Sequence, residues 1–228
     1  MSGEDASRAD ISIPGVQEEL VQALLDTGKP VVVVLMNGRP LTISKLTEQV
    51  PAIVEGWFLG TETGNAIADV LLGKYNPSGK LTMSFPRNVG QIPVFYNYRQ
   101  SGRPGTDKLT KWTNRFIDSP VSPLYPFGYG LSYTTFSYSA PRVSQKEFST
   151  NEILKVSVDV TNTGQYDGEE TIQLYIRDVI ASVTRPVKEL KGFKKIFLRK
   201  GETRTVGFEL RAEDLSFLSQ DMEPVIES

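Results

Sequence analysis

The sequence predicts an α/β layer with a mostly parallel sheet, followed by an all-β sandwich. Within residues 1–96, apolar residues recur at helical spacing between unbroken β-branched runs, which is typical of helices alternating with buried parallel strands. After residue 130 the period switches to two, and short alternating stretches are separated by Gly/Asn turns, as in a β-sandwich. A length of 228 residues accommodates one large domain or two modest ones.

The α/β elements follow from local patterns. The expected order is a helix over 16–25, a strand over 31–36, a strand over 52–58, a helix over 61–72 and a strand over 81–85. A glycine stands just beyond each helix, where a left-handed cap is wanted. The β-branched run over 31–36 suits a strand covered on both faces. Three strands are few for an open α/β sheet.

The rest of the chain is expected to be a loop and then strands. Residues 97–130 are rich in Pro, Gly and aromatic residues, and the aromatic content favours an ordered loop over a disordered linker. The sandwich strands are expected over 133–143, 153–160, 171–176, 190–198 and 203–210. No closing strand is expected in 222–228, and a usual sandwich has about seven strands, so we expect the last strand to be missing. We interpret both ends as those of a longer protein that has been cut.

The composition excludes several function classes. With no histidine and no cysteine, the chain cannot hold a Ser-His-Asp or Cys-His nucleophile, a disulfide or an ordinary zinc site. Any catalysis must use carboxylates, Lys, Tyr or a hydroxyl. A net charge of −2 argues against a nucleic-acid partner, and no apolar run approaches the ~20 residues of a membrane span.

Three groups of residues are candidates for chemistry. Glu4, four positions before Arg8, is either solvated charge on the N-terminal segment or a general acid/base on a loop. Aromatic residues of the 97–130 loop, including Tyr98 and Trp112, could stack on sugar rings or pack between the two halves of the chain and hold them together. A basic stretch over 185–204 is expected to decorate a solvent-exposed face of the strands.

Several strings, in order, resemble the C-terminal part of glycoside hydrolase family 3, the β-glucosidase and β-xylosidase group. They are Ser-Gly-Glu at 2–4 with Arg8, and the stretches 11–14, 34–40, 60–73, 75–81, 85–87, 90–93, 125–136, 160–164 and 185–193. The resemblance covers nearly the whole chain and is closest to the bacterial periplasmic β-glucosidase branch. It implies that residues 1–96 are the C-terminal portion of the family's α/β sandwich domain, 97–130 a connecting loop, and 131–228 an immunoglobulin/fibronectin III-like sandwich.

The resemblance also implies a chemistry. Family members are retaining enzymes with two carboxylates about 5–5.5 Å apart and no metal or organic cofactor. Their nucleophile is an aspartate on a (β/α)8-type barrel, and their acid/base is commonly a glutamate on a loop of the α/β domain. Glu4 falls where that glutamate stands. The barrel and its aspartate are missing from this chain, and Asp5 and Asp10 are too near Glu4 along the sequence to replace the nucleophile.

The resulting hypothesis is a fragment of a retaining, exo-acting β-glycosidase, with a β-linked glucoside or xyloside as substrate of the complete enzyme. The isolated chain is expected to be inactive without the barrel domain, its missing partner. We expect the parent enzyme to be periplasmic or secreted. The alternatives are a non-catalytic carbohydrate- or partner-binding module and a truncated gene product.

Overall fold

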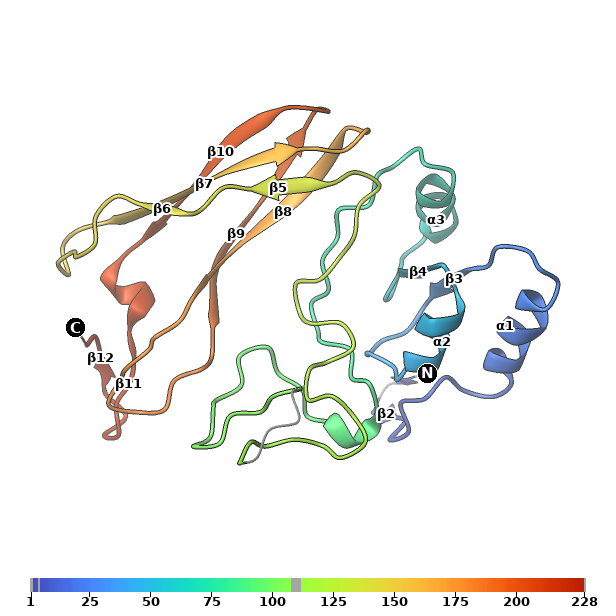
Figure 1. Cartoon of the computed structure of the whole chain (residues 1–228), viewed down its shortest axis with the longest axis horizontal. Helices are drawn as coiled ribbons and strands as arrows, with labels where there is room; N and C mark the ends of the chain where they lie inside the picture. Colours follow the sequence, from blue (N-terminus) through green and yellow to red (C-terminus); the bar gives the residue numbers. More distant parts are fainter. Residues whose placement is uncertain (1, 4, 108–111, 228) are drawn as a thin grey trace. The chain divides into compact units, whose positions relative to one another are not determined.

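Two parallel strands, β3 (Val32–Leu35) and β4 (Ala52–Glu55), lie at the centre of the first unit, with Leu35 opposite Glu55 (Figure 1). The computed structural model describes residues 2–3, 5–107 and 112–227, and this unit comprises 1–74, 81–96 and 103–129. Its helices are α1 (Gln17–Leu25), α2 (Ser44–Gln49) and α3 (Thr63–Leu71). Its core joins one strand residue to the α2 region and to a later loop: Leu35, Ile43, Leu46, Val50 and Phe85.

The predicted third strand over 81–85 is wrong. This segment contributes no strand and instead pairs with the later loop, where Phe85 N–H donates to Tyr125 O at 2.8 Å. Leu81 N–H likewise donates to Tyr129 O at 2.7 Å. The apolar residues of 81–85 bury equally well against a loop, so their pattern does not reveal which partner they take. Helix α2 was not predicted, because its six residues bury only Leu46.

The long loop has little regular secondary structure in the residues that the structure describes. Residues 97–107 and 112–130 contain no helix and no extended strand. Aromatic stacking fixes part of it, with ring centroids 4.3 Å apart for Tyr96 and Phe127 and 4.9 Å apart for Tyr125 and Tyr129. Aromatic side chains thus supply the packing that secondary structure does not.

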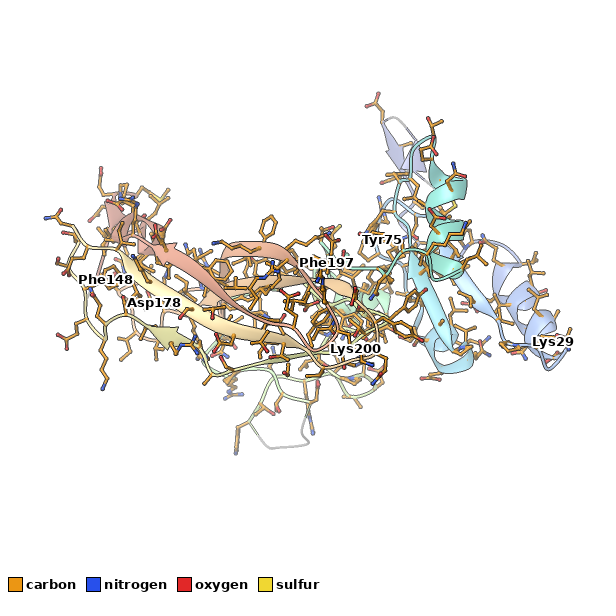
Figure 2. The ribbon with its side chains drawn as sticks, turned by 90° about the horizontal axis from the view of Figure 1, so that it is seen from above. Lys29, Tyr75, Phe148, Asp178, Phe197 and Lys200 are labelled. Carbon is orange, nitrogen blue, oxygen red and sulfur yellow. The ribbon has the colours of Figure 1, made fainter. Side chains whose placement is uncertain are left out.

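The second unit comprises 75–80, 97–102 and 130–228 and contains the predicted sandwich. One sheet has the order β10 (Thr203–Leu210), β7 (Leu154–Asn162), β5 (Phe136–Tyr138), with β6 (Arg142–Val143) also on β7. The other pairs β8 (Gly168–Ile176) with β9 (Glu189–Leu198). Figure 2 shows Asp178 beyond one end of these long strands and Lys200 beyond the other. The alternating residues bury a core of Val160, Ile172, Leu198, Val206 and Phe208.

The chain also contains two short hairpins, one near each of its ends. Near the C-terminus, β11 (Phe217–Leu218) pairs with β12 (Pro224–Val225) in a separate two-stranded sheet, which is joined to neither sheet of the sandwich. Two-residue strands are too short for alternation to show in the sequence. Near the N-terminus, β1 (Ser2–Gly3) pairs with β2 (Ala6–Ser7). Two 3₁₀ turns, Val89–Gln91 and Ala212–Leu215, complete the described elements.

Candidate functional site

The carboxyl ends of β3 and β4 carry a group of polar residues. Asn37 follows β3 by two positions, and Glu55 is the last residue of β4. Because the two strands are parallel and in register, both side chains come to the same edge of the sheet. Gly56 allows the ends of the two strands to approach closely. Its N–H donates to Leu35 O at 2.8 Å, and a Cβ at this position would lie 3.1 Å from that oxygen.

Hydrogen bonds connect this edge to the N-terminal segment. Glu55 Oε1 accepts from Trp57 N–H at 2.8 Å, and Trp57 itself has a positive φ of 51°. Asn37 Nδ2 donates to Arg39 O at 2.7 Å, and Arg39 Nη1 donates to Arg8 O at 2.8 Å. A series of hydrogen bonds thus connects the strand ends to Arg8, which lies 31 positions before Arg39 in the sequence.

Burial dominates the electrostatics of Glu55. Loss of solvent raises the pKa of its carboxyl group, while the hydrogen bond from Trp57 and the neighbouring Asn37 side chain offset part of the rise. Two buried oxygens in this group, Asn37 Oδ1 and Glu55 Oε2, have no hydrogen-bond partner among the described residues. Both are acceptors, so the site lacks a donor.

The proposed acid/base, Glu4, lies outside the described residues. In the segment that follows it, Arg8 Nη2 lies 3.5 Å from Asp10 Oδ2, and Asp10 Oδ1 accepts from Ser12 N–H at 2.8 Å. The hydrogen bonds from Ser12 and the charge of Arg8 lower the pKa of Asp10, so they favour its ionised form. Arg8 is thus engaged by Asp10 and through its main chain by Arg39.

The aromatic candidates of the loop are accessible. Tyr98 is 50% exposed and Trp112 is 77% exposed. The Arg103 guanidinium lies 5.7 Å from the centroid of the Trp112 ring, which leaves much of the indole open to solvent. Tyr98 O accepts from Val187 N–H at 2.9 Å, so its backbone is tied to the sandwich unit. The two residues belong to different units.

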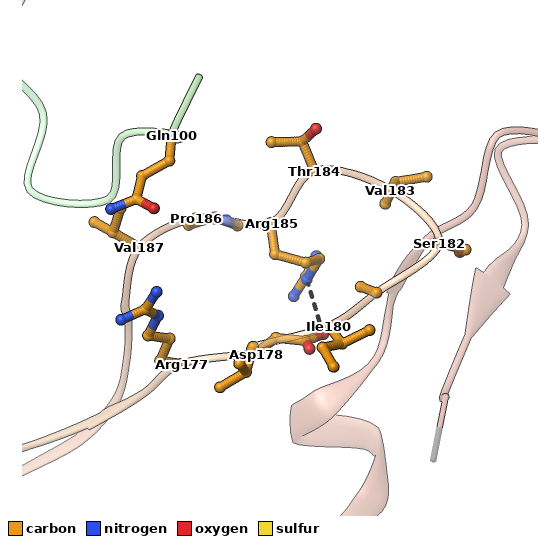
Figure 3. A pocket seen from close by; sticks show the side chains of 12 residues that line it. Gln100, Arg177, Asp178, Ile180, Ser182, Val183, Thr184, Arg185, Pro186 and Val187 are labelled. Carbon is orange, nitrogen blue, oxygen red and sulfur yellow. Dashed lines mark ion pairs between the residues drawn. The ribbon is translucent and has the colours of Figure 1, made fainter. Parts of the chain in front are cut away.

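A hollow of about 460 Å³ opens in the sandwich unit, lined by the loop between β8 and β9 and by Gln100 (Figure 3). Arg185 extends across it, 3.5 Å from Asp178 and 2.6 Å from Glu189, and its guanidinium lies 4.3 Å from the centroid of the Phe217 ring. The expectation that the basic stretch is solvent-exposed is wrong here: the side chains of Arg185 and Lys191 are 14% and 19% exposed. Their carboxylate partners make that burial tolerable.

The polar group formed by Asn37, Arg39 and Glu55 was not predicted from the sequence, although each residue lies in a stretch that the sequence analysis names. The available signal was the placement of polar residues directly after two consecutive buried strands. Among the described residues, no three acidic side chains gather as a metal site would require. The longest described helices, α1 and α3, have nine residues each, so none of those helices can cross a membrane.

Comparison with known proteins assigns the two parts of the chain. Residues 1–133 match the glycosyl hydrolase family 3 C-terminal domain, and residues 170–228 match a fibronectin type III-like domain. The periplasmic beta-glucosidase of Salmonella typhimurium is 54% identical over 98% of this chain and 29% of its own length. A beta-xylosidase of Formosa agariphila is 51% identical over 99% of this chain and 30% of its own length.

Solved structures that resemble this chain include beta-glucosidases. The beta-glucosidase of Listeria innocua, solved in complex with isofagomine, superposes with a TM-score of 0.94 at 47% identity, over 99% of this chain and 32% of that one. The chain therefore spans about 30% of the length of the relatives it matches. With both matched domains in the expected order, the chain belongs to glycosyl hydrolase family 3.

Proposed function

We propose that this chain forms the C-terminal part of a retaining, exo-acting β-glycosidase that hydrolyses β-linked glucosides or xylosides. The observation that carries the proposal is the match over nearly the whole chain to a beta-glucosidase and a beta-xylosidase. A periplasmic location of the complete enzyme is supported by the name of the Salmonella relative. The chemistry uses no metal or organic cofactor.

In this proposal Glu4 acts twice. As an aspartate on the barrel domain attacks the anomeric carbon, the Glu4 carboxyl group gives its proton to the departing glycosidic oxygen. The resulting Glu4 carboxylate then takes a proton from water, whose oxygen attacks the anomeric carbon and releases the aspartate. One proton is given and one is recovered, so the enzyme returns to its starting state.

The isolated 228-residue chain is expected to be inactive, because the acid/base alone supplies only part of the rate enhancement. The test is a chimera in which this chain replaces the matched 29% of the Salmonella relative. The chimera should hydrolyse an aryl β-glucoside, whereas the isolated chain should not. Turnover by the isolated chain at ordinary glycosidase rates would overturn the proposal.

The role of Glu4 has its own chemical test in the chimera. Glu4→Gln should lower turnover by about 10²–10⁴-fold. Azide should restore part of it, because azide attacks the glycosyl-enzyme without needing a general base. Asp5→Asn is the matched control and should change turnover less than threefold. Full activity in Glu4→Gln would remove Glu4 from the mechanism.

Exposed aromatic residues favour a second candidate, a carbohydrate-binding module. With 77% of its surface exposed, Trp112 could stack on a sugar ring. Binding of an oligosaccharide by the isolated chain, abolished in the Tyr98→Ala/Trp112→Ala variant, would support it. No binding at millimolar oligosaccharide would contradict it.

A further inference from the structure

A polar chain at the carboxyl edge of β3 and β4 reaches back to the N-terminal segment. We infer that Arg39, held in place by Asn37 and Glu55, is a positioning residue that fixes the main chain just after Glu4. The inference rests on the proposed function, in which Glu4 is the acid/base.

The hydrogen bond from Arg39 to Arg8 supports this positioning role. Arg39 is half-buried, and its Nη1 donates to the main-chain carbonyl of Arg8 at 2.8 Å. No carboxylate of the described residues lies within ion-pair distance of Arg39. A guanidinium that donates a hydrogen bond to a main-chain carbonyl restrains the position of that backbone.

This contact extends an existing anchor. Thr42 N–H donates to Ile11 O at 2.9 Å, and Ser12 bridges Thr42, so the segment is tied to the unit from Ile11 onward. The other interaction of Arg8, with Asp10, is exposed and contributes little rigidity. Arg39 therefore carries the anchor three residues closer to Glu4, to within four positions of it.

Asn37 and Glu55 set the geometry of Arg39. Asn37 Nδ2 donates to Arg39 O at 2.7 Å, which fixes the turn after β3. The Asn37 side chain adjoins the Glu55 carboxyl group, where Asn37 Oδ1 and Glu55 Oε2 are buried acceptors without a donor. Burial raises the pKa of Glu55, and the hydrogen bonds from Trp57 and Asn37 offset part of that rise. Glu55→Gln keeps a side-chain oxygen that can accept from Trp57 N–H and adds an amide donor beside Asn37 Oδ1, whereas Glu55→Ala leaves neither.

A misplaced general acid has a distinct signature in the chimera. Protonation matters for a glycoside with a poor leaving group, such as methyl β-glucoside, and hardly matters for the 2,4-dinitrophenyl glucoside, whose phenolate departs unaided. We expect Arg39→Ala to lower kcat/KM for the methyl glucoside by about 10–100-fold. For the dinitrophenyl glucoside the change should stay within about threefold, since only the proton transfer is impaired.

Companion variants separate positioning from general damage. Arg39→Lys, which keeps a donor, and Glu55→Gln should retain more activity on the methyl glucoside than Arg39→Ala does, whereas Glu55→Ala should show the same selective loss. Lys45→Ala, which removes an exposed ion pair with Glu18, is the control and should leave both substrates unaffected. An equal loss on both substrates in Arg39→Ala would overturn the inference, because it would indicate a structural role alone.

Amide hydrogen exchange tests the anchor without relying on the role of Glu4. In the 228-residue chain, Arg39→Ala should speed exchange over residues 6–10 and leave α3 unchanged. Unchanged exchange over 6–10 would overturn the inference even if the chimera is active. If Glu4→Gln shows no selective loss on the methyl glucoside, the assignment of Glu4 fails instead, and faster exchange in Arg39→Ala would still establish the anchor.

Discussion

Lys80 Nζ lies 3.1 Å from Glu170 Oε2, and the two side chains are only 15% and 10% exposed. The same ammonium group donates to Gly130 O at 2.9 Å, and the Tyr138 hydroxyl donates to Glu170 Oε1 at 2.7 Å. Burial and the Glu170 carboxylate raise the pKa of Tyr138, which therefore remains a donor. This buried ion pair ties residues 75–80 into the sandwich unit.

We expect Lys80→Met to destabilise the sandwich by about 3–5 kcal/mol, because it leaves the Glu170 charge buried without its partner. Both tryptophans, Trp57 and Trp112, belong to the first unit, so their fluorescence reports that unit. Urea unfolding followed by far-UV circular dichroism should show the loss in the β signal, while the fluorescence transition moves less.

Two controls accompany Lys80→Met. The double variant Lys80→Met/Glu170→Gln removes both charges and keeps an acceptor for Tyr138, so it should recover most of the lost stability. Arg204→Ala breaks an exposed pair with Glu202 and should cost less than about 1 kcal/mol. A cost for Lys80→Met as small as that of Arg204→Ala would contradict the prediction.

Asn162 is fully buried and holds three segments of the sandwich together. Its Nδ2 donates to Tyr166 O at 2.8 Å and Leu198 O at 3.1 Å, and its Oδ1 accepts from the Thr134 hydroxyl at 2.7 Å. Asn162→Ala removes these three hydrogen bonds at a fully buried position and should cost about 3 kcal/mol or more in the free energy of unfolding. Thr161→Ala, which removes an exposed hydroxyl contact with Thr203, should cost under about 1 kcal/mol in the same urea experiment.

The sequence predicts much of this fold because each long element carries its own period. Helices α1 and α3 begin and end within two residues of their expected limits. The alternation that predicts β7 and β10 also places Val160 and Val206 in the core. The third strand fails because the apolar residues of 81–85 pack against the later loop, a choice that depends on chain topology and not on local pattern.

The candidate site is predictable only in part. The role of Glu4 stays a prediction, since it comes from a family motif and the structure does not describe that residue. The Arg39–Asn37–Glu55 group depends on the register that sets Leu35 opposite Glu55, which no spacing along the chain specifies. Each of these residues is ordinary by itself, and only their three-dimensional arrangement distinguishes them.

Gly164 lies where no side chain fits. A Cβ at this position would stand 2.2 Å from Thr134 Oγ1 and 2.6 Å from Thr135 N. Gly164→Ala must therefore displace the Thr134 backbone and weaken its hydrogen bond to Asn162, at a cost of about 1–3 kcal/mol. Gly102→Ala, in the same unit with nothing within 4 Å, is the control and should change the urea midpoint little. Equal midpoints for the two variants would contradict this account.

Asp159 makes the sandwich sensitive to acid. It accepts two hydrogen bonds from Arg142, at 2.7 and 2.9 Å, and one from the Thr205 hydroxyl at 2.6 Å. These bonds lower the pKa of Asp159 from its ordinary 3.8 to about 2. The folded state thus favours the carboxylate, so its contribution to stability is complete above pH 3.8 and is lost as the pH falls through about 2.

The test compares the wild-type chain with Asp159→Asn, which cannot ionise. The difference in their free energies of unfolding should be constant from pH 7 to about pH 5, shrink below pH 4 and approach its minimum near pH 2. Urea titrations followed by circular dichroism measure it at each pH. Arg142→Ala should flatten this dependence, because the bidentate guanidinium is the main cause of the lowered pKa. A difference that stays constant down to pH 2 would show that the Arg142–Asp159 pair does not couple folding to protonation.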